Sequence, residues 1–191
     1  MLIHQRSYPD TKIIVWGNGI EMRLFIAINF SVEMKKTLAD LINHLKKQRV
    51  KANFTAPENL HLTLVFVGET ESEDLIIKSI EKLSVPPFEI TLENHGSFGD
   101  ILWVGIRSEK LLSAYVKNLK YDLQLSGFDI KDQKFTPHIT LARRAILKDE
   151  LDLNIPATSM RVSRISLMKS ESIDAHLNYS EIYAKILTEN W

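Results

Sequence analysis

Hydrophobic positions along the chain follow two different periods, which predicts a fold that mixes strands and helices. Apolar and β-branched runs bounded by Gly, Pro or polar residues predict strands, and apolar positions spaced three and four apart predict helices. By these criteria strands are expected at 23–30, 60–67, 88–92, 101–106, 135–143, 161–169 and 179–187. Helices are expected at 31–47, 72–83 and 109–125. Ser31 and Ser72 stand where helix N-caps are expected. The order of elements predicts an α+β protein.

The first 21 residues differ from the remainder of the chain. They contain Pro9, Gly17 and Gly19 and one apolar burst, Ile13–Trp16. Met22 then opens a strong strand pattern. We therefore expect a single domain over residues 22–191, with residues 1–21 as an extension that is vector-derived, misassigned or peripheral. The alternative is an added edge strand built on Ile13–Trp16.

Two short strings nearly repeat each other inside predicted strands. The first is His-Leu-Thr-Leu at 61–64 and the second is His-Ile-Thr-Leu at 138–141. Alternate residues of a strand share a face, so each histidine lies beside the threonine two positions later. One such string is unremarkable, because histidine is often half-buried and threonine favours strands. Two in the same context predict a shared site, between two pseudo-duplicated lobes that each contribute strands, helices and one string around a central cleft.

Composition removes several classes of protein. The 191 residues include no cysteine, which excludes disulfides, thiolate catalysis and cysteine-bound metal centres. Basic and acidic residues balance at 24 each, which argues against a protein that coats long nucleic-acid duplexes. A single nucleic-acid end or a small phosphate ester stays possible. No apolar run can span a bilayer and no secretory segment is visible at the N-terminus, so a cytoplasmic enzyme without a membrane partner is expected.

The residues of the two strings suit metal-free proton transfer at a phosphate. The pKa of an unperturbed histidine, ~6.5, allows one imidazole to be neutral while another is charged. Threonine hydroxyls can donate to charge that develops on phosphoryl oxygens. Catalytic zinc usually takes three protein ligands, but neither string holds a carboxylate. Glu58 and Glu69 flank the first string, but strand alternation does not place them on the face of His61 or they lie beyond the end of the strand. The near-symmetry of the strings leaves open which histidine is the acid.

Residues next to the strings provide weaker candidates for substrate binding. Strict alternation places Ala142 on the face of His138 and turns Arg143 away, although strand twist could let Arg143 reach a phosphate from the rim. The aromatic residues of this region are typical of a hydrophobic core, but one of them could stack on a nucleobase: Phe54, Phe66 and Trp103. The four histidines outside the strings are expected to have no catalytic role: His4, His44, His95 and His176.

With their flanks, the strings resemble a known family. The chain is similar to the LigT-like branch of the two-histidine phosphoesterase superfamily, the RNA 2',3'-cyclic phosphodiesterases or 2'-5' RNA ligases. The segments that carry the resemblance are Met22–Ala27, Asn59–Gly68 and Pro137–Arg143. The resemblance implies a bilobal α+β domain whose antiparallel sheets flank a central cleft. It also implies hydrolysis of RNA 2',3'-cyclic phosphate ends to 2'-phosphates without a cofactor, and possible reversal as 2'-5' ligation.

Roles for individual residues also follow from the resemblance. Carried over by position, His61 is the proton donor and His138 the proton acceptor, while Thr63 and Thr140 hold the phosphate oxygens. We expect a monomer whose substrates are RNA 3' ends with a 2',3'-cyclic phosphate or small cyclic phosphate esters. Two alternatives stay open: a phosphodiesterase specific for a small nucleotide derivative, and a non-catalytic nucleotide- or RNA-binding module.

Overall fold

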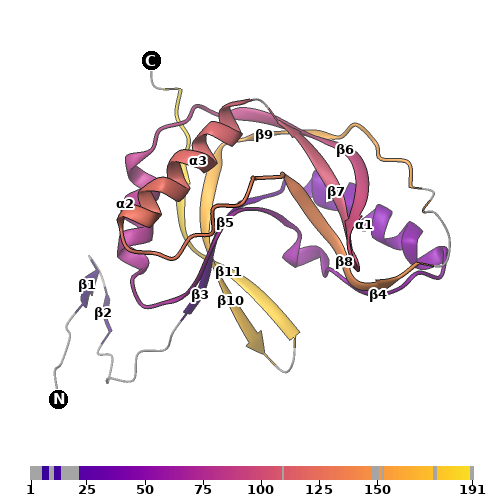
Figure 1. Ribbon diagram of the computed structural model, residues 1–191, viewed down its shortest axis with the longest axis horizontal. Helices are drawn as coiled ribbons and strands as arrows, with labels where there is room; N and C mark the ends of the chain where they lie inside the picture. Colours follow the sequence, from indigo (N-terminus) through magenta and orange to yellow (C-terminus); the bar gives the residue numbers. More distant parts are fainter. Residues whose placement is uncertain are drawn as a thin grey trace.

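In the described residues of the computed structural model, the fold is built from two large antiparallel sheets, a two-stranded hairpin and three α-helices (Figure 1). The structure describes residues 6–8, 11–13, 22–108, 110–147, 151, 153–173 and 176–189. The helices are α1 (Val32–Lys47), α2 (Glu73–Lys82) and α3 (Lys110–Leu125), and a 3-10 turn, η1, spans Pro57–Asn59. As the sequence predicts, the part of the chain that the structure describes is an α+β fold.

One sheet has four strands in the order β11-β10-β3-β5 and the other has five in the order β4-β8-β7-β6-β9. The four-stranded sheet contains β3 (Met22–Asn29), β5 (His61–Thr70), β10 (Arg164–Ile173) and β11 (His176–Ile186). The five-stranded sheet contains β4 (Lys51–Phe54), β6 (Phe88–Phe98), β7 (Ile101–Ser108), β8 (His138–Ile146) and β9 (Ser159–Val162). Each sheet takes strands from both halves of the chain, so the two lobes are not two sequence halves.

A short hairpin at the N-terminus forms a third sheet. Strands β1 (Arg6–Tyr8) and β2 (Thr11–Ile13) pair antiparallel with each other, in a two-stranded sheet of their own. Neither belongs to the two larger sheets, and of the edge strand expected on Ile13–Trp16 only Ile13 is described. Residues 14–16 of the apolar burst lie outside the described part of the chain.

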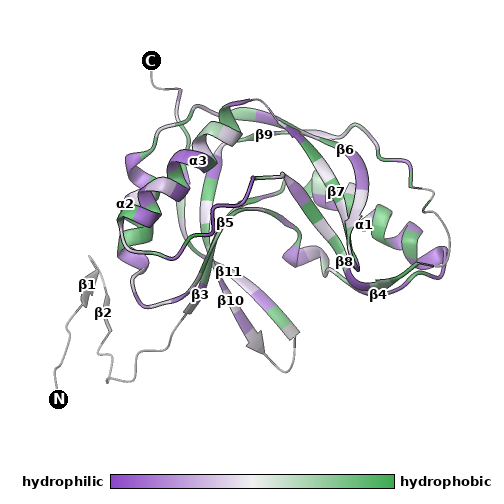
Figure 2. Ribbon diagram, viewed as in Figure 1, coloured by the Kyte–Doolittle hydropathy of each residue, from purple (hydrophilic) through white to green (hydrophobic). Residues whose placement is uncertain are grey.

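The helices bury one face each against the outer sides of the sheets. In Figure 1, α2 and α3 lie beside the four-stranded sheet, and α1 lies beside the five-stranded one. The ribbons of these helices alternate between hydrophobic and hydrophilic colours in Figure 2. The buried face of α1 keeps the predicted spacing: Met34, Leu38, Leu41, Ile42 and Leu45. Ser31 caps α1 as expected, since its hydroxyl accepts from the Met34 N–H at 3.2 Å.

Four local predictions were wrong. The strand expected at 161–169 is two strands in different sheets, because buried Val162 and Ile165 are three positions apart and break the alternation. The strand expected at 88–92 continues as β6 to Phe98, because a bulge at Asn94 (φ 37°) re-phases the strand rather than ending it. Strand β5 continues past Gly68 to Thr70. The Ser72 side chain does not cap α2.

A single large apolar core connects the two sheets and the helices. Its fully buried members include Leu24, Ile26 and Ile28 of β3, which alternate with residues on the opposite face of the same sheet. That opposite face carries a small second cluster, made of Phe25, Ala27 and Met168 with Tyr179 against it. The first face anchors the sheet to the core, and the second face is available to form a site. Within the described residues, no helix is both long enough and apolar enough to cross a membrane.

Candidate active site

The two His-x-Thr strings lie on strands β5 and β8 and face one cavity of about 510 Å³. Each histidine and threonine is half-buried, while the intervening Leu62 and Ile139 are fully buried in the core. Strand parity thus places the polar pairs on the cavity side and the apolar residues on the core side. The structure brings together His61, Thr63, His138, Thr140 and Arg143, all of which line the cavity.

His61 is fixed by hydrogen bonds on both ring nitrogens. Nδ1 lies 2.7 Å from the Asn59 carbonyl oxygen, and Nε2 lies 3.0 Å from Oγ1 of Thr63. A carbonyl only accepts, so Nδ1 carries the proton, and Nε2 of the neutral ring accepts from the Thr63 hydroxyl. Phe25 and Tyr179 pack against the ring at centroid distances of 4.9 and 5.2 Å. These contacts direct Nε2 toward the threonine and the cavity.

The electrostatic surroundings of His61 favour its neutral form in the free protein. Burial lowers the pKa of His61 from its usual 6.5, the hydrogen bond to the Asn59 carbonyl opposes this shift, and the positive charges of Arg143 and Lys35 lower the pKa further. A phosphate anion in the cavity would offset the charge of Arg143, so its arrival favours protonation of His61.

His138 repeats the same arrangement from the other sheet. Its Nδ1 donates to the Thr136 carbonyl oxygen at 2.7 Å, which leaves Nε2 as the nitrogen available to a ligand. Phe98 lies edge-on to the ring at 5.1 Å, and Trp103 lies 5.1 Å from Phe98. Gly96 is required under this packing, because a Cβ there would stand 2.4 Å from the Trp103 ring. Both histidines therefore adopt the same tautomer by the same backbone device.

The prediction that Arg143 points away from the face of His138 was wrong, because β8 contains a bulge. In the pairing of β7 with β8, Trp103 faces Thr140 and Leu102 faces Ala142, so Leu141 is the extra residue. The bulge reverses the alternation: Ala142 is fully buried, and Arg143 is exposed and lines the cavity. The Arg143 side chain therefore lines the cavity directly and does not need strand twist to reach it.

Several cavity residues were missed by sequence analysis. Arg23 and Phe25 had a detectable signal, because they alternate on one face of the predicted first strand. The cavity residues of β10 and β11, together with Thr55 and Asn59, had no such signal in the sequence. Only the tertiary pairing of the strands brings them close to the two strings. The missed lining residues are Arg23, Phe25, Thr55, Asn59, Ser170, Leu177 and Tyr179.

Asn59 connects the start of β5 to the hairpin of β10 and β11. Its carbonyl oxygen accepts from His61, as described above, and its side-chain amide donates to the Leu177 carbonyl oxygen at 2.7 Å. The position of the hairpin and the orientation of His61 are thus linked through one residue.

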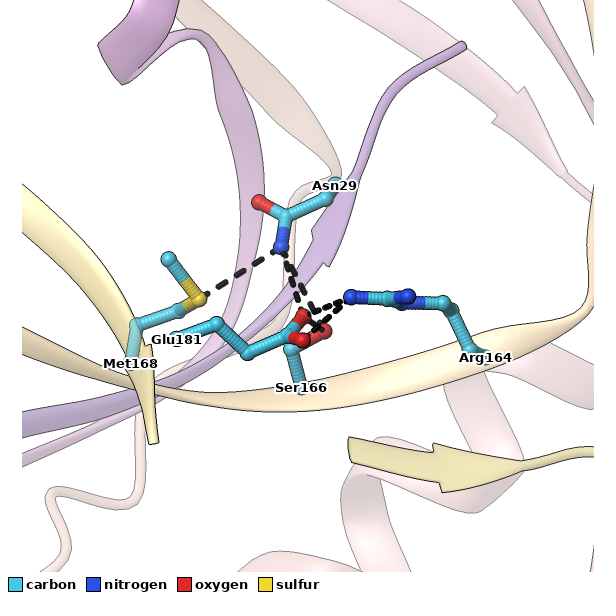
Figure 3. A network of polar contacts seen from close by, with 5 residues as sticks. All are labelled: Asn29, Arg164, Ser166, Met168 and Glu181. Carbon is cyan, nitrogen blue, oxygen red and sulfur yellow. Dashed lines mark hydrogen bonds and ion pairs between the residues drawn. The ribbon is translucent and has the colours of Figure 1, made fainter. Parts of the chain in front are cut away.

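A polar network joins strands β3, β10 and β11 of the four-stranded sheet. Asn29 lies opposite His61 in the pairing of β3 with β5. Figure 3 shows its amide directed at Ser166, Met168 and Glu181, and Glu181 also binds Arg164 and Ser166. Burial alone would raise the pKa of Glu181, but hydrogen bonds from Ser166 and Arg164 hold that pKa below its usual value. The charged network therefore ties β11 and β10 to the strand that supports His61.

The donors around the cavity do not form an evident metal site. Among the described residues, no group of three or more His, Cys, Asp or Glu side chains converges on one point. Glu58 and Glu69, which flank the first string, are not among the residues that line the cavity. The polar groups that face the cavity are imidazoles, hydroxyls, an amide and guanidinium groups, which suit an anionic ligand.

A bilobal domain with paired His-x-Thr strands at one cleft defines the class of the two-histidine phosphoesterases. The family model of the 2'-5' RNA ligase superfamily matches residues 34–174, and the chain belongs to this family. A relative from Thermotoga maritima, named RNA 2',3'-cyclic phosphodiesterase, is 30% identical over 177 residues, which cover 85% of this chain and 94% of the relative. A relative from Escherichia coli with the same name is 30% identical over 129 residues, covering 64% and 72% of the two chains.

Solved structures share the fold. The crystal structure of E. coli LigT in apo form matches with a TM-score of 0.79 and 26% identity, and the match covers 88% of this chain and 99% of that one. The crystal structure of E. coli LigT complexed with 3'-AMP matches with a TM-score of 0.77 and 25% identity over the same shares.

Proposed function

We propose that this protein hydrolyses 2',3'-cyclic phosphate ends of RNA to 2'-phosphate ends by metal-independent acid–base catalysis. The observation that carries the proposal is the pairing of two histidines across one cavity, each with Nδ1 bound to a backbone carbonyl and Nε2 left for chemistry. The names of the curated relatives support the same reaction. We further propose that residues 22–191 form the domain that performs it.

The reaction needs a base on one side of the phosphorus and an acid on the other. Nε2 of His138 accepts a proton from water, and the water oxygen bonds to phosphorus. The bond between phosphorus and O3' breaks, and O3' takes the Nε2 proton of protonated His61. The products are a 2'-phosphate and a free 3'-hydroxyl, and proton exchange with solvent restores both imidazoles. With a 5'-hydroxyl in place of water as the nucleophile, the same displacement would form a 2'-5' phosphodiester and free the 3'-hydroxyl, without a nucleotide cofactor.

The remaining polar groups stabilise the phosphate rather than transfer protons. Thr63 and Thr140 present hydroxyls that can donate to the non-bridging oxygens, where negative charge increases in the transition state. Arg143 adds a fixed positive charge with planar donor geometry, which suits phosphate oxygens. The Thr63 hydroxyl now donates to Nε2 of His61 and must turn to the phosphate when His61 becomes protonated.

Product analysis tests the proposal most directly. An oligoribonucleotide with a 2',3'-cyclic phosphate end should be converted to a 2'-phosphate end, and a 3'-phosphate product would contradict the assignment of the broken bond. Because the site supplies its own acid and base, we expect full turnover in excess EDTA. Strong inhibition by EDTA that added divalent ions reverse would instead establish metal catalysis. Tight binding of the same RNA with no turnover would support a binding module.

The pH dependence of kcat/KM tests the role of His61. As the proton donor, His61 acts only when protonated, and its pKa is lowered in the free protein. We therefore expect kcat/KM to fall as the pH rises through a value below 6.5. Arg143 lowers this pKa, so Arg143→Gln should move the falling limb to higher pH, in addition to weakening phosphate binding.

Arg144 provides a matched control for this shift. Arg144 is the neighbouring exposed arginine and is not among the residues that line the cavity. Arg144→Gln should therefore leave the falling limb of the pH profile of kcat/KM at the same pH. A kcat/KM that rises through the same pKa would show that His61 acts as the base and would reverse the assigned roles.

A further inference from the structure

Three polar side chains on strand β4 form a row that begins inside the cavity and leads out of it. The row consists of Thr55, Asn53 and Lys51, which are two residues apart and therefore share one face of the strand. The Thr55 N–H donates to the Leu141 carbonyl oxygen at 2.9 Å, so the pairing with β8 continues past the end of β4. Thr55 lines the cavity, while Asn53 and Lys51 lie beyond its lining.

Two further observations place this row on the cavity side of the sheet. The residues that alternate with it, Ala52 and Phe54, pack against the core. The Lys46 ammonium of α1 lies 5.4 Å from the centroid of the Phe54 ring, on that same face. Asn53 stands opposite Arg143 in the pairing of β4 with β8, and residues directly opposite each other share a face. Because Arg143 lines the cavity, the row continues the surface of the site.

The outer part of the row is open to a ligand. Lys51 and Asn53 are both exposed. Strand β4 is the edge strand of the five-stranded sheet, so no described strand pairs with its outer side. Within the described residues, neither the Lys51 ammonium nor the Asn53 side-chain amide is held by a hydrogen bond or an ion pair. These donors are therefore free to bind a molecule that extends out of the cavity.

Charge distinguishes this way out of the cavity from the hairpin on the opposite wall. The whole chain is neutral, but residues 46–51, which lead into the row, contain four basic residues and no acidic one. Arg143 adds a further exposed cation beside Asn53. On the hairpin of β10 and β11, by contrast, the Lys169 ammonium is paired with the Glu171 carboxylate at 2.7 Å. An anionic chain that leaves the cavity is therefore attracted along β4.

We propose that the row binds the sugar-phosphate backbone of the nucleotides that precede the terminal one, so that single-stranded RNA leaves the cavity along β4. The inference rests on the proposed function and adds the surface that favours an RNA chain over a small cyclic nucleotide. Lys51 lies about 13 Å from Thr55 along the strand. A nucleic-acid strand carries a phosphate about every 3.4 Å of rise in a duplex, so even a stretched strand brings a further phosphate to the row. Such contacts carry no sequence preference.

Two substrates with the same reacting end test the proposal: adenosine 2',3'-cyclic phosphate and an octaribonucleotide that ends in it. We expect the wild-type protein to open the octamer with the higher kcat/KM. Lys51→Gln should lower kcat/KM for the octamer by up to about 5-fold, the effect of one exposed ion pair, and leave the mononucleotide unchanged. Lys51→Glu should lower it further. For the octamer, the slope of log kcat/KM against log salt should become shallower by about 0.7 in Lys51→Gln, because one phosphate contact is lost.

The matched control removes the same charge from the other face of β4. Lys46→Gln should change neither rate nor the salt slope, because the Lys46 ammonium lies over Phe54 and away from the row. An unchanged salt slope in Lys51→Gln, equal losses on both substrates, or the same loss in Lys46→Gln would overturn the proposed path. A wild-type protein that opens the mononucleotide as efficiently as the octamer would overturn it too, in favour of a small-nucleotide substrate. A protein that opens neither would instead overturn the proposed function.

Discussion

Replacement of His138 by alanine should lower kcat for opening of an RNA 2',3'-cyclic phosphate by about 10²- to 10⁴-fold, and His61→Ala should do the same. In the proposed mechanism, each change removes one of the two groups that transfer a proton in the same step. Single-turnover kinetics on an end-labelled oligonucleotide measure the chemical step without interference from product release. Because both groups act on one transition state, the double variant should lose much less than the product of the two single losses.

The fold should survive the loss of His138. The ring is half-buried, its Nδ1 donates to the nearby carbonyl of Thr136, and its aromatic neighbours Phe98 and Trp103 belong to the same five-stranded sheet. His61 packs between Phe25 and Tyr179, so His61→Ala should lower the melting temperature more than His138→Ala does.

Controls for the histidine prediction come from within the chain. His44 is an exposed histidine on α1 whose ring bonds to Gln48, and His44→Ala should retain full activity. Added imidazole should partly restore the rate of His138→Ala, because the missing group is a proton acceptor at an open cavity. Full activity in either single variant at the cavity would refute two-histidine catalysis.

The positions of the strings were predictable because they depend on short-range rules. Parity along a strand determines that His61 and Thr63 share a face, and β-branched and apolar neighbours determine that the segment is a strand. The same rules failed at Phe66 and Arg143, since a bulge arises from how a strand pairs with its neighbour and leaves no mark on a single strand. Periodicity therefore could not place these two residues on the lining of the cavity.

Longer-range features were unpredictable for a related reason. Strand β10 (Arg164–Ile173) pairs with β3 (Met22–Asn29), although the two strands are far apart in sequence. Periodicity predicts a strand but not its partner, so the contributions of Tyr179 and Leu177 to the cavity could not be foreseen. The switch of the chain from one sheet to the other at Ser163 was likewise hidden within one apparently continuous strand.

Removal of the Thr140 hydroxyl should lower kcat by about 10²- to 10³-fold, the loss expected for one donor to a developing oxyanion. Thr140→Val preserves the shape and strand preference of the side chain and removes only the hydroxyl. The backbone contact of this residue is preserved as well, because Thr55 donates from Oγ1 to the Thr140 carbonyl oxygen at 2.8 Å rather than to its side chain. The melting temperature should therefore stay close to that of the wild type.

Thr63→Val should cost at least as much, since the Thr63 hydroxyl also donates to Nε2 of His61. Its loss removes a phosphate donor and frees the imidazole to turn. Thr63→Ser and Thr140→Ser keep the hydroxyl and are the matched controls. Their rates are expected to stay within about tenfold of the wild-type rate, which is a smaller loss than that expected when the donor is missing. If the serine and valine variants lost activity equally, the methyl groups rather than the hydroxyls would matter, and the threonines would be packing residues. A larger effect on kcat than on KM would place the hydroxyl contacts in the transition state, where charge on the phosphoryl oxygens is greatest.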